Sequence, residues 1–293
     1  MPISDNTRGA ILMMLSMAAF TLNDTLIKTV SADVPLFQAV FLRGLLTTAM
    51  IATIAALRGA FRVRLRGADW RVIGYRTIGE LGSTIAYLVA LFHMKIGSVV
   101  AILQSLPLAI TLAGAVFFHE QVGWRRYLAI LVGLFGVMMI VQPGMAGFNG
   151  YSVLALVAVA FVVLRDLSTR ALGASVPSIL VALSASLSVT LLGAAGTVFK
   201  GWQPVTTSAL MALSGAAVFI VAGYMFAVMV MRVGNIAFVS TFRYSALLWG
   251  LTLGFAVFGE VPDRLTVIGS LIVVGMGLFT LYRENRLRKG RRV

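Results

Sequence analysis

Two stretches far apart in the chain repeat one pattern of charges within apolar sequence. An acid is followed four residues later by a base in each stretch, and the pairs are Asp24 with Lys28 and Asp166 with Arg170. A second match relates residues 86–97 to residues 223–234, and each copy then continues through an apolar segment to a glutamate, Glu120 or Glu260. Hydropathy predicts five membrane-spanning segments in each copy, and an odd number forces the second copy to enter the membrane from the opposite side. The pattern therefore predicts two inverted repeats, an arrangement typical of secondary transporters.

The composition also points to a membrane, because apolar residues make up 59% of the chain and charged residues only 12%. We predict an all-α integral membrane protein with ten transmembrane helices. A first five-helix repeat covers residues 1–142, and an inverted second repeat with a basic tail covers residues 143–293. The predicted helices lie near residues 9–30, 35–57, 71–93, 97–118, 124–141, 150–171, 176–199, 206–231, 236–258 and 262–282.

The net charge of +14 is concentrated on one side of this predicted topology. The bases of that side flank the connection between the second and third helices, follow the fourth helix and fill the tail; they are Arg58, Arg62, Arg64, Arg66, Arg71, Arg125, Arg126, Arg283, Arg286, Arg288, Lys289, Arg291 and Arg292. The positive-inside rule then predicts that both termini are cytoplasmic, in the inner (plasma) membrane. The charge is explained by topology and by contact with the lipid bilayer, and nucleic-acid binding is not expected.

Several motifs resemble the drug/metabolite transporter superfamily of the EamA type. The motifs are Asn23-Asp24 with Lys28, Phe41-Leu42-Arg43-Gly44, the segment from Pro107 to Glu120, and the segment from Phe242-Arg243-Tyr244 to Glu260. The resemblance covers nearly the whole chain and implies a central cavity lined by the first, third, fourth, sixth, eighth and ninth helices. It also implies a carrier of small metabolites, because the family includes exporters of neutral and aromatic amino acids and carriers of S-adenosylmethionine and riboflavin.

Charged residues inside membrane segments are candidates for gates. Each costs at least about 2.5 to 3.5 kcal/mol at the bilayer centre, so each should face a partner, the bundle interior or water. Asp24 with Lys28, Arg76 with Glu80, and Asp166 with Arg170 are spaced to pair along one helix face, while Arg43 needs acceptors on another helix. We predict that the gating residues are Asp24, Lys28, Asp166, Arg170, Arg43 and Arg76. A purely structural role for the pairs is the alternative.

Polar and aromatic residues at membrane depth are candidates for substrate binding. Gln104 precedes Pro107, which frees a backbone carbonyl, and an amide with an unpaired carbonyl suits a zwitterion. Arg243 suits a carboxylate, and aromatic rings suit stacking on a substrate ring. The predicted binding residues are Gln104, Arg243, Tyr244, Trp249, Tyr87, Tyr224, Ser83 and Glu80. For Ser83 and the aromatic residues, simple helix packing is the alternative.

Glycines in the fifth and tenth helices predict that these two helices pack closely along each other as a scaffold. The glycines are Gly133, Gly136, Gly269, Gly275 and Gly277.

The predicted function is secondary transport by alternating access, most simply the export of neutral or aromatic amino acids. The alternatives are a carrier of S-adenosylmethionine or riboflavin, and a channel-like pore. No motif of a hydrolase, an ATP-driven pump or a zinc protease occurs, so an enzyme is not expected. We expect no metal and no cofactor, a small-molecule substrate as partner, and a monomer or weak homodimer.

Overall fold

A computed structural model describes residues 5–62, 67–117, 124–143, 149–171, 176–230 and 239–290. Within these residues every regular element is a helix. The helices are α1 (Asp5–Thr29), α2 (Leu36–Leu57), η1 (Ala60–Arg62), α3 (Gly67–His93), α4 (Ile96–Leu103), α5 (Leu106–Phe117), α6 (Trp124–Val141), α7 (Tyr151–Ala171), α8 (Ser178–Lys200), α9 (Thr207–Val230), η2 (Ser240–Tyr244), α11 (Ser245–Phe258) and α12 (Arg264–Gly290).

Most of these helices have the length and composition of membrane spans. Among the described residues, seven helical stretches are long and apolar enough to cross a membrane, and Tyr127–Val141 and Arg264–Thr280 form shorter apolar helices. Large apolar side chains are exposed on the outer surface, with Leu131, Phe135 and Leu271 each more than 60% accessible. Exposed apolar surface on this scale is typical of a protein that is surrounded by lipid.

Prolines set where several helices begin or stop. Pro35 and Pro177 immediately precede α2 and α8, where the missing N–H has no cost. Pro107 cannot donate to the carbonyl of Leu103, and the α-helical pattern stops there. The fourth predicted helix, 97–118, is therefore two helices, α4 and α5, joined at Gln104 and Ser105.

The ninth predicted helix, 236–258, is irregular at the equivalent place. Tyr87 matches Tyr224 in the sequence repeat, and the same offset relates the junction at Gln104 to Thr241. Thr241 lies in η2, a 3-10 turn that leads into α11. Residues 231–238 lie outside the described residues. The described part of the ninth predicted helix is therefore also not a single α-helix.

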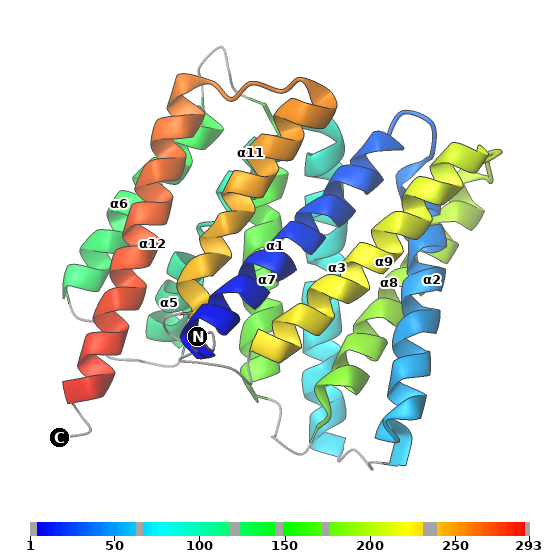
Figure 1. Cartoon of the computed structure of the whole chain (residues 1–293), viewed down its shortest axis with the longest axis horizontal. Helices are drawn as coiled ribbons and strands as arrows, with labels where there is room; N and C mark the ends of the chain where they lie inside the picture. The colour runs from blue at the N-terminus through cyan, green and yellow to red at the C-terminus, as the bar shows by residue number, and fades with distance from the viewer. Residues whose placement is uncertain are drawn as a thin grey trace.

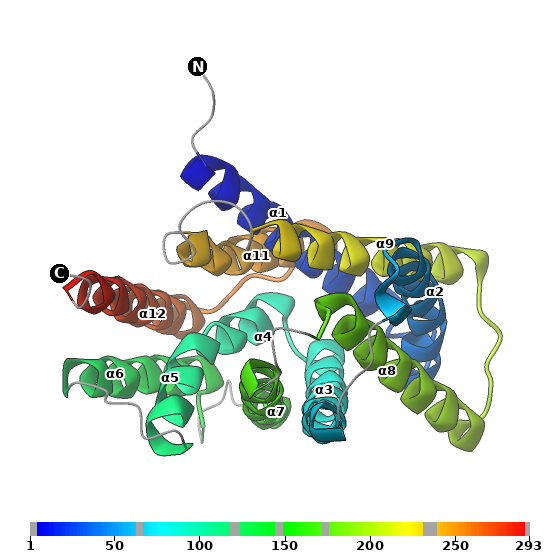
Figure 2. The same ribbon diagram turned by 90° about the horizontal axis from the view of Figure 1, so that it is seen from below.

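Helices from the first half of the chain pack in pairs against helices from the second half. The pairs are α1 with α9, α2 with α8, α3 with α7, and α6 with α12. Figure 2 shows the α6–α12 pair at one edge of the bundle and the α2–α8 pair at the other, with α3 and α7 side by side between them. Figure 1 shows that α1 begins and α12 ends at the same end of the molecule.

The predicted scaffold of the fifth and tenth helices is confirmed by the contact between α6 and α12. A Cβ added to Gly269 would lie 2.5 Å from the carbonyl oxygen of Gly136, and one added to Gly136 would lie 2.9 Å from the carbonyl oxygen of Gly269. The two backbones meet directly, as they do where small residues line a membrane interface. We call this contact the glycine seam.

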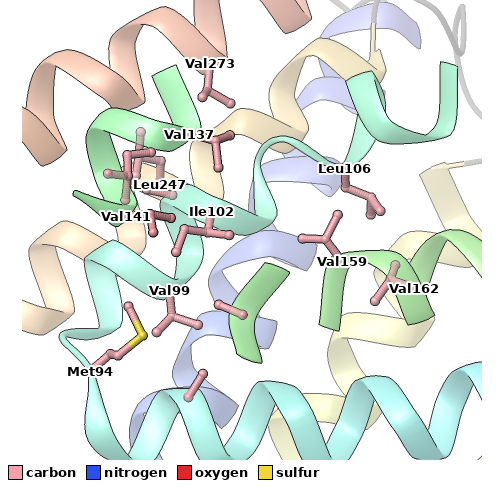
Figure 3. Packing of buried hydrophobic residues seen from close by; sticks show 14 residues of the cluster. Met94, Val99, Ile102, Leu106, Val137, Val141, Val159, Val162, Leu247 and Val273 are labelled. Atoms are coloured by element: carbon pink, nitrogen blue, oxygen red, sulfur yellow. The ribbon is translucent and has the colours of Figure 1, made fainter. Parts of the chain in front are cut away.

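The largest apolar core lies between the seam and the middle of the bundle. Figure 3 shows Val137 of α6 and Val273 of α12 together with Ile102 of α4 and Leu247 of α11. Val137 and Val273 are fully buried. This packing fixes α4 and α11 against the scaffold pair.

Candidate functional site

The sequence predicted that Lys28 pairs with Asp24, but Lys28 instead contacts Glu260, which follows α11, and Met94, which follows α3. Its ammonium nitrogen lies 2.5 Å from Oε1 of Glu260 and donates to the carbonyl of Met94. The Lys28 and Glu260 side chains are 10% and 16% exposed. The local pair is replaced because the long lysine side chain reaches two acceptors beyond its own helix. A buried ion pair therefore joins the first half of the chain to the second.

The backbone beyond α11 places Glu260 for this contact. Gly259 has a φ of +64°, which favours glycine, and it ends the helix. The N–H of Glu260 then donates to the carbonyl of Gly254 at 3.0 Å. With its backbone held in this way, the carboxylate accepts the N–H of Ile96, the first residue of α4, at 2.7 Å through Oε2. One carboxylate thus contacts both α1 and α4.

Asp24 lies at the centre of a second group of polar contacts. Its Oδ2 accepts the hydroxyl of Tyr87 at 2.6 Å, and its Oδ1 accepts the side-chain amide of Asn23 at 2.9 Å. The oxygen of that amide accepts Nη1 of Arg43 at 3.1 Å. The prediction that Arg43 needs an acceptor on another helix is confirmed, because Asn23 belongs to α1 and Arg43 to α2.

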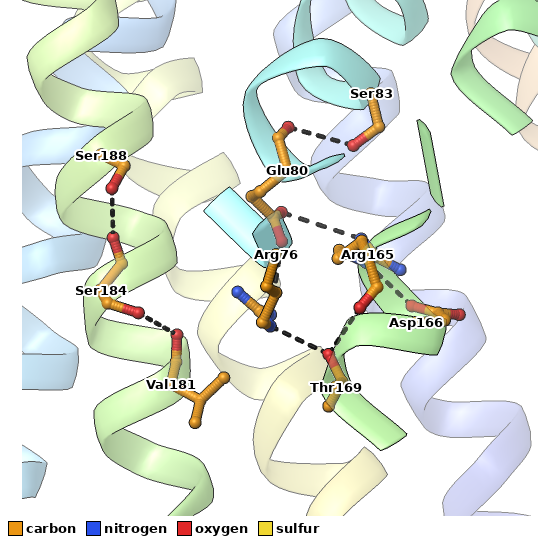
Figure 4. A network of polar contacts seen from close by, with 9 residues as sticks. All are labelled: Arg76, Glu80, Ser83, Arg165, Asp166, Thr169, Val181, Ser184 and Ser188. Carbon is orange, nitrogen blue, oxygen red and sulfur yellow. Dashed lines mark hydrogen bonds and ion pairs between the residues drawn. The ribbon is translucent and has the colours of Figure 1, made fainter. Parts of the chain in front are cut away.

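A third group joins α3 to α7 and is shown in Figure 4. Nη2 of Arg76 lies 3.4 Å from Oε2 of Glu80, which confirms the predicted pairing on one helix. Nη1 of Arg165 lies 3.8 Å from Oε1 of Glu80, and Nε of Arg165 lies 2.9 Å from Oδ1 of Asp166. We call these four residues the charge network. Arg165 bridges the two acids, and sequence reasoning had not singled it out.

Asp166 therefore pairs with its neighbour in sequence, whereas the sequence had predicted a pair with Arg170. The side chain of Arg170 lies outside the part of the chain that the structure describes, and so does Glu120, the sequence match of Glu260. The equivalence of the two acid and base pairs stays a prediction.

A polar cavity of about 70 Å³ lies between α2, α3, α8 and α9. Arg43 and Glu80 line it from the first half of the chain, and Tyr224 and Ser186 line it from the second; the remaining lining residues are Gly44, Thr47, Thr84, Ala182, Ala185, Val189 and Ile220. Glu80 and Tyr224 were predicted to bind substrate and Arg43 to gate, so the cavity brings together residues from both predicted sets. Of the helices predicted to line the central cavity, only α3 and α9 contribute here.

Other predicted binding residues lie away from this cavity. Gln104 is 8% exposed at the junction of α4 and α5, and its buried Nε2 has no hydrogen-bond partner among the described residues. Tyr244 packs on α12, where a Cβ at Gly277 would lie 1.6 Å from its hydroxyl oxygen. Trp249 is 38% exposed. Arg243 has an accessible side chain, but its guanidinium lies within electrostatic reach of Asp166 and Arg165 of the charge network.

Ser83 and Tyr87 lie on α3 beside the networks. Ser83 donates to the backbone carbonyl of Glu80 at 3.0 Å, which is a local contact within the helix. A Cβ at Gly79, one turn before Ser83, would lie 2.7 Å from the backbone nitrogen of Arg165, so the small-residue face packs on α7. Tyr87 contacts Asp24, as described above. Helix packing, the alternative to substrate binding, therefore accounts for Gly79 and Ser83, whereas the side chain of Tyr87 makes a polar contact.

The chain is similar in sequence to known transporters and in fold to a solved structure. Residues 7–142 match the EamA-like transporter family. The pseudopaline exporter of Pseudomonas aeruginosa is 24% identical over 274 residues, covering 91% of this chain and 93% of the relative. An S-adenosylmethionine uptake transporter of Rickettsia prowazekii is 21% identical and covers 95% and 94%, and a riboflavin transporter of Vibrio cholerae is 26% identical and covers 66% and 65%. A solved crystal structure has the same fold, with a TM-score of 0.63 at 20% identity, covering 94% of this chain and 98% of that chain.

Proposed function

Because the chain is an EamA-type transporter of the drug/metabolite transporter superfamily and not an enzyme, we propose that it moves a small metabolite by alternating access, exporting neutral or aromatic amino acids. The observation that carries the proposal is the polar cavity, which is lined by residues of opposite charge and lies between the two halves of the chain. A site enclosed between two halves can be exposed to either side by relative movement of those halves.

The ten-helix inverted repeat is part of the same proposal. In support of it, each pairing of a first-half helix with a second-half helix has a counterpart under exchange of the halves: α1 with α9 corresponds to α7 with α3. The pairs α2 with α8 and α6 with α12 correspond to themselves. The matching interruptions at Gln104 and at η2 also fit two copies of one unit.

The proposed gates are two contacts that join the halves. The pair of Lys28 with Glu260 lies outside the cavity, whereas the charge network includes Glu80 of the cavity wall. Lys28 with Glu260 closes the end of the bundle opposite to the start of α1. The charge network, with Asp166, ties α3 to α7. Opening at one gate while the other stays closed is the minimum that alternating access requires.

A second candidate function is the transport of S-adenosylmethionine or riboflavin. Relatives that cover 62% or more of this chain carry these substrates in their names, and that similarity favours both as test compounds. The decisive experiment is counterflow in proteoliposomes with a panel of amino acids, nucleosides, S-adenosylmethionine and riboflavin. Accelerated exchange of amino acids supports the first proposal, whereas exchange confined to another compound replaces it. Conductance without saturable exchange identifies a pore.

We propose further that both termini are cytoplasmic in the plasma membrane. The supporting observation is the excess of basic residues on the side of the connection after α2 and of the tail. The chain contains no cysteine, so a single introduced cysteine reports its own position. Asn149→Cys should react with an impermeant reagent from outside, and Gly67→Cys only from inside. The reverse pattern would refute the orientation.

A further inference from the structure

The polar cavity carries opposite charges on its wall. Arg43 and Glu80 both line it, and both are 7% exposed. We propose that this cavity binds the headgroup of a zwitterionic substrate, with Arg43 holding the carboxylate and Glu80 holding the ammonium. The inference rests on the proposed transport function. It gives Arg43 a binding role in place of the predicted gating role, and it places the headgroup, as distinct from the rest of the substrate, in this cavity.

Arg43 has donors to spare for a carboxylate. Its side chain donates one hydrogen bond to a described residue, from Nη1 to Asn23 at 3.1 Å. A guanidinium has five N–H donors in a planar fork that matches a carboxylate. Asn23 fixes the orientation of the fork, because its own amide is held by Asp24. The substrate carboxylate would therefore meet a preoriented partner.

Glu80 has an acceptor to spare for an ammonium group. Its Oε2 is buried and accepts no hydrogen bond from a described residue. The guanidinium groups of Arg76 and Arg165 lie at 3.4 Å and 3.8 Å from its oxygens, which is beyond good hydrogen-bond distance. Leaving a buried acceptor unsatisfied costs about 1–3 kcal/mol, and an ammonium with three donors would remove that cost.

The wall of the cavity carries one charge of each sign, on Arg43 and Glu80. A zwitterion places each of its charges next to the opposite charge on the wall. An amine or a carboxylic acid would leave one of the two wall charges without a partner in a low-dielectric interior.

The size of the cavity limits the claim to the headgroup. About 70 Å³ is far below the roughly 300–1,000 Å³ of a pocket that encloses a drug-sized ligand. Thr47, Thr84 and Ser186 add hydroxyl groups to the wall and suit the same small polar group. The substrate side chain has to lie beyond this cavity, so the structure assigns the headgroup and leaves the side chain free.

The test is the binding of matched compounds to the purified full chain in nanodiscs, measured by calorimetry. L-Alanine is compared with ethylamine and propionate, and L-phenylalanine with 2-phenylethylamine and 3-phenylpropionate, so that each series removes one charge at a time. We expect at least one of the amino acids to bind about tenfold or more tightly than both of its analogues, because a site built for a polar group rejects ligands that lack it.

Variants then assign each charge to its partner. Arg43→Gln should abolish the preference over the amine, and Glu80→Gln should abolish the preference over the acid. Arg125→Gln and Asp33→Asn, both at exposed positions, are the matched controls and should keep both preferences. If Arg43→Gln does not fold, Arg43→Lys replaces it in the test. Lysine retains the charge without the planar fork, so the preference for the amino acid over the amine should be reduced but not abolished.

The outcomes separate this inference from the transport proposal. Equal binding of all three headgroups in both series, or no binding of either amino acid, overturns the zwitterion site. Preferences that survive in Arg43→Gln and Glu80→Gln overturn its location. A headgroup preference without any counterflow contradicts transport alone, whereas amino-acid counterflow without a preference contradicts this inference alone.

Discussion

The glycine seam and the polar contacts between the halves differ in kind, although both join the first half of the chain to the second. We call the polar contacts, which are the pair of Lys28 with Glu260 and the charge network, the polar centre. At the seam, Gly136 and Gly269 bring two backbones into direct contact beside a fully buried valine core. In the polar centre, the halves meet through ion pairs and hydrogen bonds, and buried atoms of Arg76 and Glu80 remain without hydrogen-bond partners.

This difference indicates which of the two contacts can rearrange during transport. Close backbone packing has one low-energy arrangement, and any separation loses many dispersion contacts together. A polar network that is incompletely satisfied has alternative partners of similar energy, including water and a ligand. We therefore expect the seam to hold the halves together and the polar centre to rearrange.

Reversing the charge of Lys28 should have the largest effect. Lys28→Glu removes one partner of a buried pair, and such a loss costs about 3–5 kcal/mol. The thermal midpoint of the purified protein and its transport rate should both fall, and the additional change Glu260→Lys should recover much of each. Lys95→Glu is the control, because Lys95 is exposed at the same end and contacts only the carbonyl of Val261. Failure of the double variant to recover would show that the pair is not what joins the halves there.

Removing the hydroxyl of Tyr87 should have the next largest effect. Tyr87→Phe deletes the 2.6 Å hydrogen bond to Asp24, and hydrogen bonds to charged groups are worth about 1.5–3 kcal/mol. Tyr224→Phe is the matched control, since no hydrogen bond joins the Tyr224 hydroxyl to a described residue. Chemical denaturation should show the loss for Tyr87→Phe, and equal stability of the two variants would contradict the role of the network.

Filling the glycine seam should affect folding without affecting selectivity. In Gly269→Val the Cβ would lie 2.5 Å from the Gly136 carbonyl oxygen, and overpacking of this kind costs about 1–3 kcal/mol. Gly275→Val on the same helix is the control, because nothing lies within 4 Å of its added Cβ. The thermal midpoint should fall only for Gly269→Val, while the ranking of substrates in counterflow stays unchanged. A changed ranking would mean that the seam is part of the site.

The smallest expected effect concerns the helix interruptions. Gln104→Ala or Arg243→Ala should lower counterflow by a factor of about two to ten, the equivalent of one hydrogen bond. Trp124→Ala, in the exposed first turn of α6, should leave the flux unchanged at equal protein amounts. If all three variants transport equally, the interruptions do not take part in recognition, and the polar cavity alone remains as the site.

The helical architecture could be predicted from the sequence because it depends on local properties. Hydropathy located the helices to within a few residues except at the end of α12, which continues to Gly290 where the prediction ended at 282. Pro107 indicated a disturbed backbone where α4 gives way to α5. The glycines indicated the contact of α6 with α12, since only small residues allow backbones to meet. Small residues thus indicated some of the places where one helix contacts another.

The partners of the charged residues could not be predicted, because they depend on packing between distant segments. Asp24 and Lys28 are spaced for a local pair, yet each has a partner elsewhere: Tyr87 of α3 for Asp24, and Glu260 in the segment after α11 for Lys28. The repeat had already marked Glu260 as the match of Glu120, but its partner follows only from the positions of α1 and α11. Arg165 was missed because a base next to an acid in sequence gives no sign that it also reaches Glu80.

The two carboxylate oxygens of Glu260 have different partners, and this difference affects how the end of the bundle that Lys28 and Glu260 hold closed could open. Oε2 is bound to a backbone N–H of α4, which needs a replacement acceptor if it is released, whereas Oε1 is bound to an ammonium that water can solvate. The first bond to exchange is therefore the one to Lys28. If this end opens during transport, we expect α4 and the end of α11 to stay linked through Glu260, and α1 to separate from them once Lys28 has also left the carbonyl of Met94.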